Sequence, residues 1–118
     1  MGMLDHWHPV HPSRDLKKGA VVGVQVAGKL ICLYRTESGQ AAAVDDVCPH
    51  RRLKLSYGRV VGDRIECKYH GWTFDGSGKC TEISHSLFGH KMPNVKIKSF
   101  PVMEKYGLIF IFPGNPEL

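Results

Sequence analysis

Two short runs decide what this sequence can do: Cys48-Pro49-His50 and Cys67-Lys68-Tyr69-His70. Each run contains one thiol and one imidazole, and residues 51–66 separate the two runs. A binuclear iron–sulfur cluster with mixed ligands takes thiolates on one iron and imidazoles on the other. The spacing therefore predicts a cluster held by two loops. The four predicted ligands, of both the cofactor and its metal, are Cys48, His50, Cys67 and His70.

The composition is that of one folded domain. The chain has 118 residues, of which 42% are hydrophobic, so it can bury a core of ordinary size. We predict a single domain over residues 1–118, with cluster-binding loops at about 46–57 and 66–76. Four cysteines in a chain of this length do not indicate a disulfide scaffold.

The charge and hydropathy exclude several classes of protein. The net charge of +5 suits an acidic redox partner, and it equally suits a plain basic surface. We find no polybasic tail and no basic-aromatic alternation, so nucleic acid is not an expected partner. No apolar run approaches the ~18 residues of a membrane helix, and the N-terminus has no apolar signal region. We expect a cytoplasmic protein without a membrane partner.

Glycine and proline punctuate short apolar runs, which favours strands over helices. Hairpins are expected at Ala27-Gly28-Lys29 and at Gly62-Asp63. Turn signals recur at the intervals of an antiparallel β-sandwich or a small barrel. Both ligand runs then fall at loop tips between strands. The predicted strands cover residues 20–26, 30–35, 40–44, 59–61, 64–67, 73–75, 79–81, 95–100 and 108–112.

The ligand runs and their flanks resemble one family. Cys48-Pro49-His50-Arg51, followed by Cys67-Lys68-Tyr69-His70-Gly71-Trp72-Thr73-Phe74-Asp75, resembles the Rieske domain of ring-hydroxylating and related oxygenases. Trp7-His8-Pro9-Val10 is similar to the opening of that domain. The run from Tyr106 to Gly114 is similar to its closing strand. The resemblance covers the chain from about Trp7 to Gly114.

The resemblance implies an all-β fold, a Rieske-type antiparallel β-sandwich with a smaller cluster-binding subdomain. It implies a [2Fe-2S] cluster with Cys48 and Cys67 on one iron and with His50 and His70 on the other. It also implies one-electron transfer, as the electron-entry domain of a Rieske oxygenase such as a dioxygenase. The donor would be a reductase or a ferredoxin, and the acceptor an oxygenase catalytic domain or subunit.

A free-standing Rieske ferredoxin is the alternative to an oxygenase domain. This chain alone has no room for a substrate pocket and a catalytic iron domain, so we predict no catalytic residues in it.

The class of Rieske domain follows from four positions. Respiratory Rieske domains carry a disulfide between their ligand loops, and Leu53 and Tyr69 stand at the comparable positions here. They also carry a Ser and a Tyr that donate hydrogen bonds to the cluster sulfurs, where this chain has Trp72 and Phe74. Such donors stabilise the reduced state, so their absence predicts a low reduction potential of around −150 mV.

Other features have competing interpretations. Glu82, His85 and His90 resemble a two-His-one-carboxylate iron site, although loop histidines are the simpler interpretation. Cys32 and Cys80 are expected to be buried inert thiols. Zinc could occupy a Cys2His2 ligand set, which would make the chain an interaction module. The order of ligands here differs from that of zinc fingers.

Overall fold

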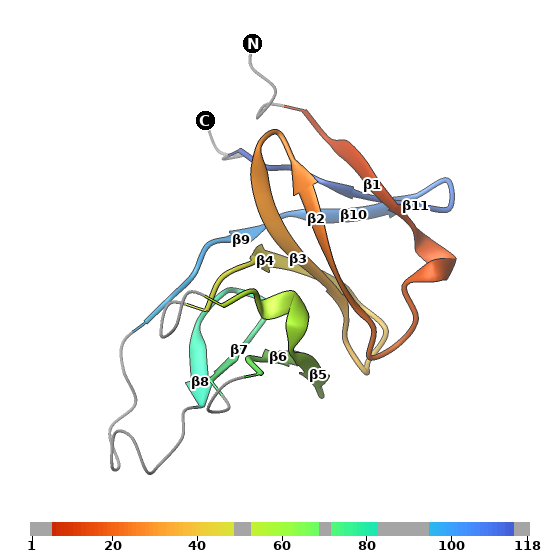
Figure 1. The fold of residues 1–118 in the computed structure, drawn as a ribbon. Helices are drawn as coiled ribbons and strands as arrows, with labels where there is room; N and C mark the ends of the chain where they lie inside the picture. Colours follow the sequence, from red (N-terminus) through yellow and green to blue (C-terminus); the bar gives the residue numbers. More distant parts are fainter. Residues whose placement is uncertain (1–5, 49–52, 69–71, 83–94, 115–118) are drawn as a thin grey trace.

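The computed structural model describes residues 6–48, 53–68, 72–82 and 95–114, and it places their strands in three antiparallel sheets (Figure 1). The first sheet has the order β1-β11-β10, the second β2-β3-β4-β9 and the third β5-β6-β7-β8. This confirms the all-β fold with antiparallel sheets. The strands are β1 (His8–Pro12), β2 (Val21–Val26), β3 (Lys29–Arg35), β4 (Ala41–Asp45), β5 (Arg59–Val61), β6 (Arg64–Glu66), β7 (Thr73–Phe74), β8 (Cys80–Glu82), β9 (Ser99–Phe100), β10 (Val102–Lys105) and β11 (Leu108–Ile111).

Strand β3 separates two apolar cores. Because successive side chains of a strand point to opposite faces, Cys32 and Tyr34 enter one core while Ile31 and Leu33 enter the other. All four side chains are fully buried. The second core lies between the first two sheets, where Ile109 meets it from β11. The first core lies between the second sheet and the third, and it contains the predicted thiol ligands.

The β2–β3 hairpin turns where the sequence predicts, with Lys29 belonging to β3 rather than to the loop. Val26 pairs with Lys29, which leaves Ala27 and Gly28 as a two-residue loop. Both have positive φ, 51° and 82°, as a type I′ turn requires. Gly62 and Asp63 likewise form the two-residue loop between β5 and β6, with Gly62 at φ 63°.

The third sheet is joined to the second by a reciprocal pair of hydrogen bonds. The backbone N–H of Glu37 donates to the Gly62 carbonyl at 2.9 Å, and the Gly62 N–H donates to the Glu37 carboxylate. Turn β7–β8 is held in the same way against residues 95–97. The Ile97 N–H donates to the Gly78 carbonyl, and the Cys80 N–H to the Val95 carbonyl. These contacts make the third sheet a subdomain fastened to the sandwich.

The structure adds four elements that the sequence did not predict. Strands β1 and β10 are the two edges of the first sheet. Two three-residue 3₁₀ helices, η2 (Ser13–Asp15) and η3 (Leu55–Tyr57), occupy connections. The described residues include no helix with the length and apolar character needed to span a bilayer.

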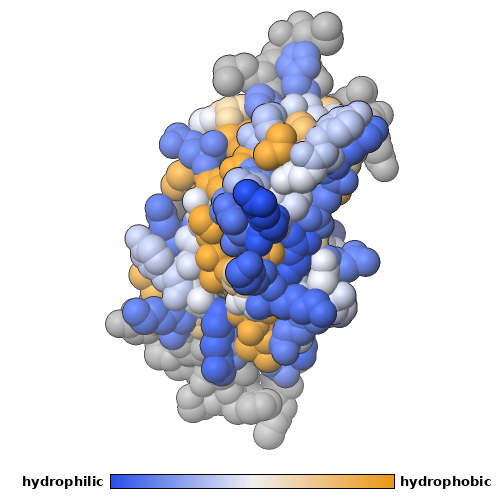
Figure 2. All heavy atoms as spheres, turned by 90° about the vertical axis from the view of Figure 1, so that its right-hand side faces the viewer, coloured by the Kyte–Doolittle hydropathy of each residue, from blue (hydrophilic) through white to orange (hydrophobic). Residues whose placement is uncertain are grey.

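Surface apolar side chains are scattered. On the face shown in Figure 2, hydrophilic residues surround smaller hydrophobic areas. Single exposed apolar residues are normal on a soluble surface and need no partner to explain them. The large ones among the described residues are Trp7, Leu30, Tyr57, Tyr106 and Leu108.

Candidate metal centre

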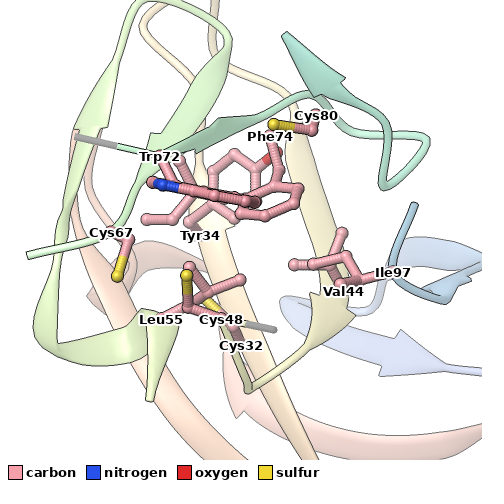
Figure 3. Packing of buried hydrophobic residues seen from close by; sticks show 11 residues of the cluster. Cys32, Tyr34, Val44, Cys48, Leu55, Cys67, Trp72, Phe74, Cys80 and Ile97 are labelled. Carbon is pink, nitrogen blue, oxygen red and sulfur yellow. The ribbon is translucent and has the colours of Figure 1, made fainter. Parts of the chain in front are cut away.

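Two predicted ligands, Cys48 and Cys67, enter the same apolar core from different sheets. Cys48 follows β4 of the second sheet and Cys67 follows β6 of the third, one residue beyond the strand expected to contain it. Their exposed fractions are 0% and 1%. Figure 3 shows both side chains in the cluster of buried residues, below the Trp72 ring in that view. Loops that are distant in the sequence therefore bring two thiols into one apolar environment.

Each ligand loop is closed at its base by the cysteine itself. The Cys48 N–H donates to the Leu53 carbonyl at 2.7 Å, and the Cys67 N–H donates to the Trp72 carbonyl at 2.6 Å. Cys48 and Leu53 also form an isolated antiparallel bridge. A short loop closed in this way holds its first residue in a fixed orientation. His50 and His70 lie within these loops, outside the described residues, so their roles stay predictions.

Cys32 and Cys80, which are outside the two ligand runs, form a separate group from Cys48 and Cys67. All four are buried. Burial raises the pKa of the Cys32 thiol well above its ordinary value, and the charge of Asp46 adds to the effect. Burial also raises the pKa of Cys80, against the opposing hydrogen bond to the Glu82 carbonyl. Cys32 and Cys80 therefore remain protonated at neutral pH, as expected for inert core thiols.

Aromatic side chains pack around the two predicted ligand thiols. Trp72 is 4% exposed, and Phe74 and Leu55 are fully buried in the same core. This apolar surrounding excludes water and lowers the local dielectric, and both properties influence the reduction potential of a metal centre. Phe74 has no hydroxyl to donate to a cluster sulfur, in agreement with the non-respiratory interpretation.

The chemistry of the two buried thiols fits the predicted [2Fe-2S] cluster. Two buried thiols without a disulfide suit the thiolate-bound iron of a mixed-ligand cluster. Within the described ranges, no group of three or more His, Cys, Asp or Glu side chains gathers. This is expected when the two histidine ligands are outside those ranges.

The alternative iron site at Glu82, His85 and His90 is only partly visible. Glu82 ends β8 with an exposed side chain, and its carboxylate lies 3.9 Å from the Arg64 guanidinium. His85 and His90 lie outside the described residues. Glu82 thus has a surface ion pair as its structural role.

Two residues that flank the first loop had no sequence signal strong enough to single them out. Asp46 and Ser56 are hydrogen bonded to each other across that loop. A carboxylate two residues before a ligand run and a serine shortly after it were the available hints.

A model of the Rieske [2Fe-2S] domain matches residues 6–101. The chain belongs to this family. Rieske domains carry a [2Fe-2S] cluster, and the cofactor predicted from the ligand runs is thereby confirmed.

Several relatives are named as oxygenases or oxidoreductases. The chain is 44% identical over 97% of its length to 4beta-methylsterol monooxygenase of Methylococcus capsulatus, and covers 31% of that protein. It is 43% identical over 75% of its length to the oxygenase component of dicamba O-demethylase of Stenotrophomonas maltophilia, and covers 26% of it. It is 33% identical over 96% of its length to the oxidoreductase NdmD of Pseudomonas putida, of which it covers 19%.

Solved structures give the same assignment. Dicamba monooxygenase bound to 3,6-dichlorosalicylic acid superposes with a TM-score of 0.86 at 34% identity, over 98% of this chain and 34% of that one. NdmA of Pseudomonas putida superposes with a TM-score of 0.82 at 31% identity, over 92% of this chain and 34% of that one. The chain therefore spans about a third or less of these relatives, and it has the fold of Rieske oxygenase Rieske domains.

Proposed function

We propose that this domain transfers single electrons as the electron-entry domain of a Rieske oxygenase. Its donor is a reductase or a ferredoxin, and its acceptor is an oxygenase catalytic domain or subunit. When bound, the [2Fe-2S] cluster supplies the one-electron chemistry. Cys48 and Cys67 hold one iron, and His50 and His70 hold the other. The oxygenases among the relatives support this role over others.

One observation carries the proposal: Cys48 and Cys67 reach a single apolar core from loops of two different sheets. Inert thiols can occupy any core position, as Cys32 and Cys80 do. The distinguishing feature of Cys48 and Cys67 is that each closes, by its own backbone N–H, a short loop that contains a predicted histidine ligand. That arrangement fixes both sulfur atoms while the remainder of each loop supplies a histidine.

The chain offers a matched test within its own four cysteines. Cys48→Ala and Cys67→Ala should abolish the visible absorbance and the bound iron after anaerobic reconstitution. Cys32→Ala and Cys80→Ala remove equally buried thiols and should leave the colour. His50→Ala and His70→Ala should bleach the protein, with His6→Ala as their control. A Cys48→Ala or Cys67→Ala variant with the full visible spectrum would sink the proposed ligand set.

The electron-transfer role has its own test. The reconstituted protein, reduced with dithionite and freed of excess reagent without oxygen, should reduce cytochrome c by one electron per chain. A colourless preparation with stoichiometric zinc, after the same reconstitution, would instead favour the zinc-binding module.

A free-standing Rieske ferredoxin remains the second candidate for the same chemistry. The two are distinguished by the gene: a catalytic iron domain in the same reading frame supports the oxygenase domain. The relatives include monooxygenases and a demethylase, so the substrate and the dioxygenase class are not assigned. A cytoplasmic location, without membrane or nucleic-acid partners, stays a prediction that fractionation of the native host would check.

A further inference from the structure

A buried carboxylate stands beside the first ligand loop. Asp46 follows the end of β4 and precedes Cys48 by two positions, and its exposed fraction is 6%. Its backbone N–H donates to the Leu30 carbonyl at 3.1 Å, which fastens this point of the chain to β3. Carboxylates are rarely buried unless they are paired, because burial removes the hydration of the charge.

The carboxylate binds the far side of the same loop. Oδ1 of Asp46 accepts a hydrogen bond from the Ser56 backbone N–H at 2.7 Å, and Oδ2 accepts one from the Ser56 hydroxyl at 2.7 Å. Ser56 belongs to η3, which begins two residues after Leu53. Asp46 and Ser56 therefore join the two ends of the segment whose base is the Cys48–Leu53 hydrogen bond. We call this pair the loop clamp.

Strand β2 leaves room for the loop clamp by having no side chain at Gly23. A Cβ at this position would lie 2.9 Å from Oδ2 of Asp46 and 2.9 Å from the Ser56 hydroxyl oxygen. Gly23 has no positive φ that would call for glycine, so space is the reason for its small size. Strand β2, helix η3 and the end of β4 thus meet at the Asp46 carboxylate.

No described cation neutralises this carboxylate. The ion pairs among the described residues involve Glu104, Glu66 and Glu82, and none involves Asp46. Within the described ranges, the two hydrogen bonds from Ser56 stabilise this charge without neutralising it. The charge also acts on one core thiol, because it adds to burial in raising the pKa of Cys32.

We propose that Asp46 is a positioning residue for the first ligand loop and that its negative charge lowers the midpoint potential of the cluster bound there. The proposal rests on the proposed function, because it takes Cys48 as a ligand. Reduction adds one negative charge to the cluster, and a fixed carboxylate nearby makes that step less favourable. The hydroxyl of Ser56 has the opposite influence, because it partly offsets the charge of the carboxylate.

Two variants of the loop clamp separate the effect of its charge from the effect of its structure. Asp46→Asn keeps the shape: its amide oxygen can accept from the Ser56 N–H and its amide nitrogen can donate to the hydroxyl. It removes the charge, so the midpoint potential should rise. Ser56→Ala keeps the charge and removes one donor to it, so the potential should fall. Asp15→Asn alters an exposed carboxylate in η2 by the same charge and should leave the potential unchanged.

The positioning role has a separate readout. Both Ser56→Ala and Gly23→Ala disturb the loop clamp while the carboxylate remains. Each should release iron to a chelator faster than the parent protein, by about tenfold if one hydrogen bond of about 1.4 kcal/mol is lost. The visible spectrum before chelation should be unchanged. Should Asp46→Asn fold but bind no cluster, the positioning role is supported and Ser56→Ala provides the potential test.

Certain outcomes would overturn the inference while sparing the proposed function. Shifts of the potential in the same direction for Asp46→Asn and Ser56→Ala would show that loosening, and not charge, is being measured. An unchanged potential in Asp46→Asn would remove the electrostatic role outright. The proposed function fails by a different result, the retention of colour in Cys48→Ala.

Discussion

Replacing Arg35 with Met should destabilise the sandwich without altering the cluster site. The Arg35 guanidinium is buried at the end of β3, with a side-chain exposure of 10%. Its Nε donates to the Leu16 carbonyl at 2.8 Å, and Nη2 donates to the Ser13 carbonyl at 2.9 Å. Nη1 donates to the Glu104 carboxylate at 2.6 Å and to the Gly39 carbonyl at 3.2 Å. One side chain therefore joins η2, the β3–β4 turn and β10.

The magnitude follows from what the substitution leaves behind. Met fills much of the volume but donates no hydrogen bond, so the Leu16 and Gly39 carbonyls and the Glu104 carboxylate lose this donor. The Ser13 carbonyl keeps the hydrogen bond from the Leu16 N–H. Removing one partner of a buried ion pair costs about 3–5 kcal/mol. The Glu104 side chain is 34% exposed and can recover some hydration, which favours the lower part of that range. We expect a loss of about 3–4 kcal/mol, or roughly 10–20 °C in the melting temperature.

Urea and thermal unfolding of the reconstituted protein measure this loss directly. Arg14→Met is the matched control, because Arg14 is exposed in η2 next to Ser13 and should change the unfolding free energy by no more than about 0.5 kcal/mol. The visible spectrum of Arg35→Met at low temperature should equal that of the parent protein. A loss below about 1 kcal/mol would refute the reasoning, because the hydrogen bonds would then contribute nothing beyond solvation.

Three further outcomes are expected. The hydrogen bond from Arg35, opposed by partial burial, holds the pKa of Glu104 below its ordinary value. Its stabilisation is therefore complete above about pH 4.3 and is lost as the pH falls through the lowered folded-state pKa. Glu104→Gln should flatten the decline of the unfolding free energy below that pH, and an unchanged acid limb in urea titrations would contradict this. Gly58→Ala should destabilise the third sheet by several kcal/mol, because a Cβ would overlap the Glu66 carbonyl oxygen; near-parental urea unfolding would show that the backbone can yield there. The midpoint potential of the parent protein should lie around −150 mV, because the second loop offers no hydroxyl where respiratory domains have Ser and Tyr, and a value above roughly +100 mV contradicts this.

The strands that the sequence predicted well are those with a strong apolar pattern between turn residues. Strand β5 has the predicted bounds, Arg59–Val61, and β3 begins one residue earlier than expected. Strand β1 was missed for a physical reason. It contains Pro9 and Pro12, which are tolerated only where a strand has a free edge. Its pairing with β11 depends on a neighbour about a hundred residues away, which no local pattern contains.

The site, like the fold, could be predicted only where it depends on residues close together in the sequence. The two Cys-His runs are local, and the burial of Cys48 and Cys67 in one core agrees with them. The partnership of Asp46 with Ser56 depends on how the chain returns after the first loop, so the residues alone could not reveal it. The roles of His50 and His70 stay predictions for the substitutions described above.

The division of the molecule by β3 explains why stability and redox properties should respond to different substitutions. Side chains on one face of β3 pack against β11 in the core between the first two sheets. Those on the other face, Cys32 and Tyr34, share a core with residues of the third sheet and with the predicted ligands Cys48 and Cys67. Arg35 pairs with Glu104 of β10 in the first sheet, and Glu104 is 34% exposed, so solvent screens its charge once the guanidinium is removed. A substitution at Arg35 should therefore move the melting temperature and leave the midpoint potential close to that of the parent protein. The charge of Asp46, which borders the thiol-containing core, should move the midpoint potential, and that contrast is the sharpest check on both assignments.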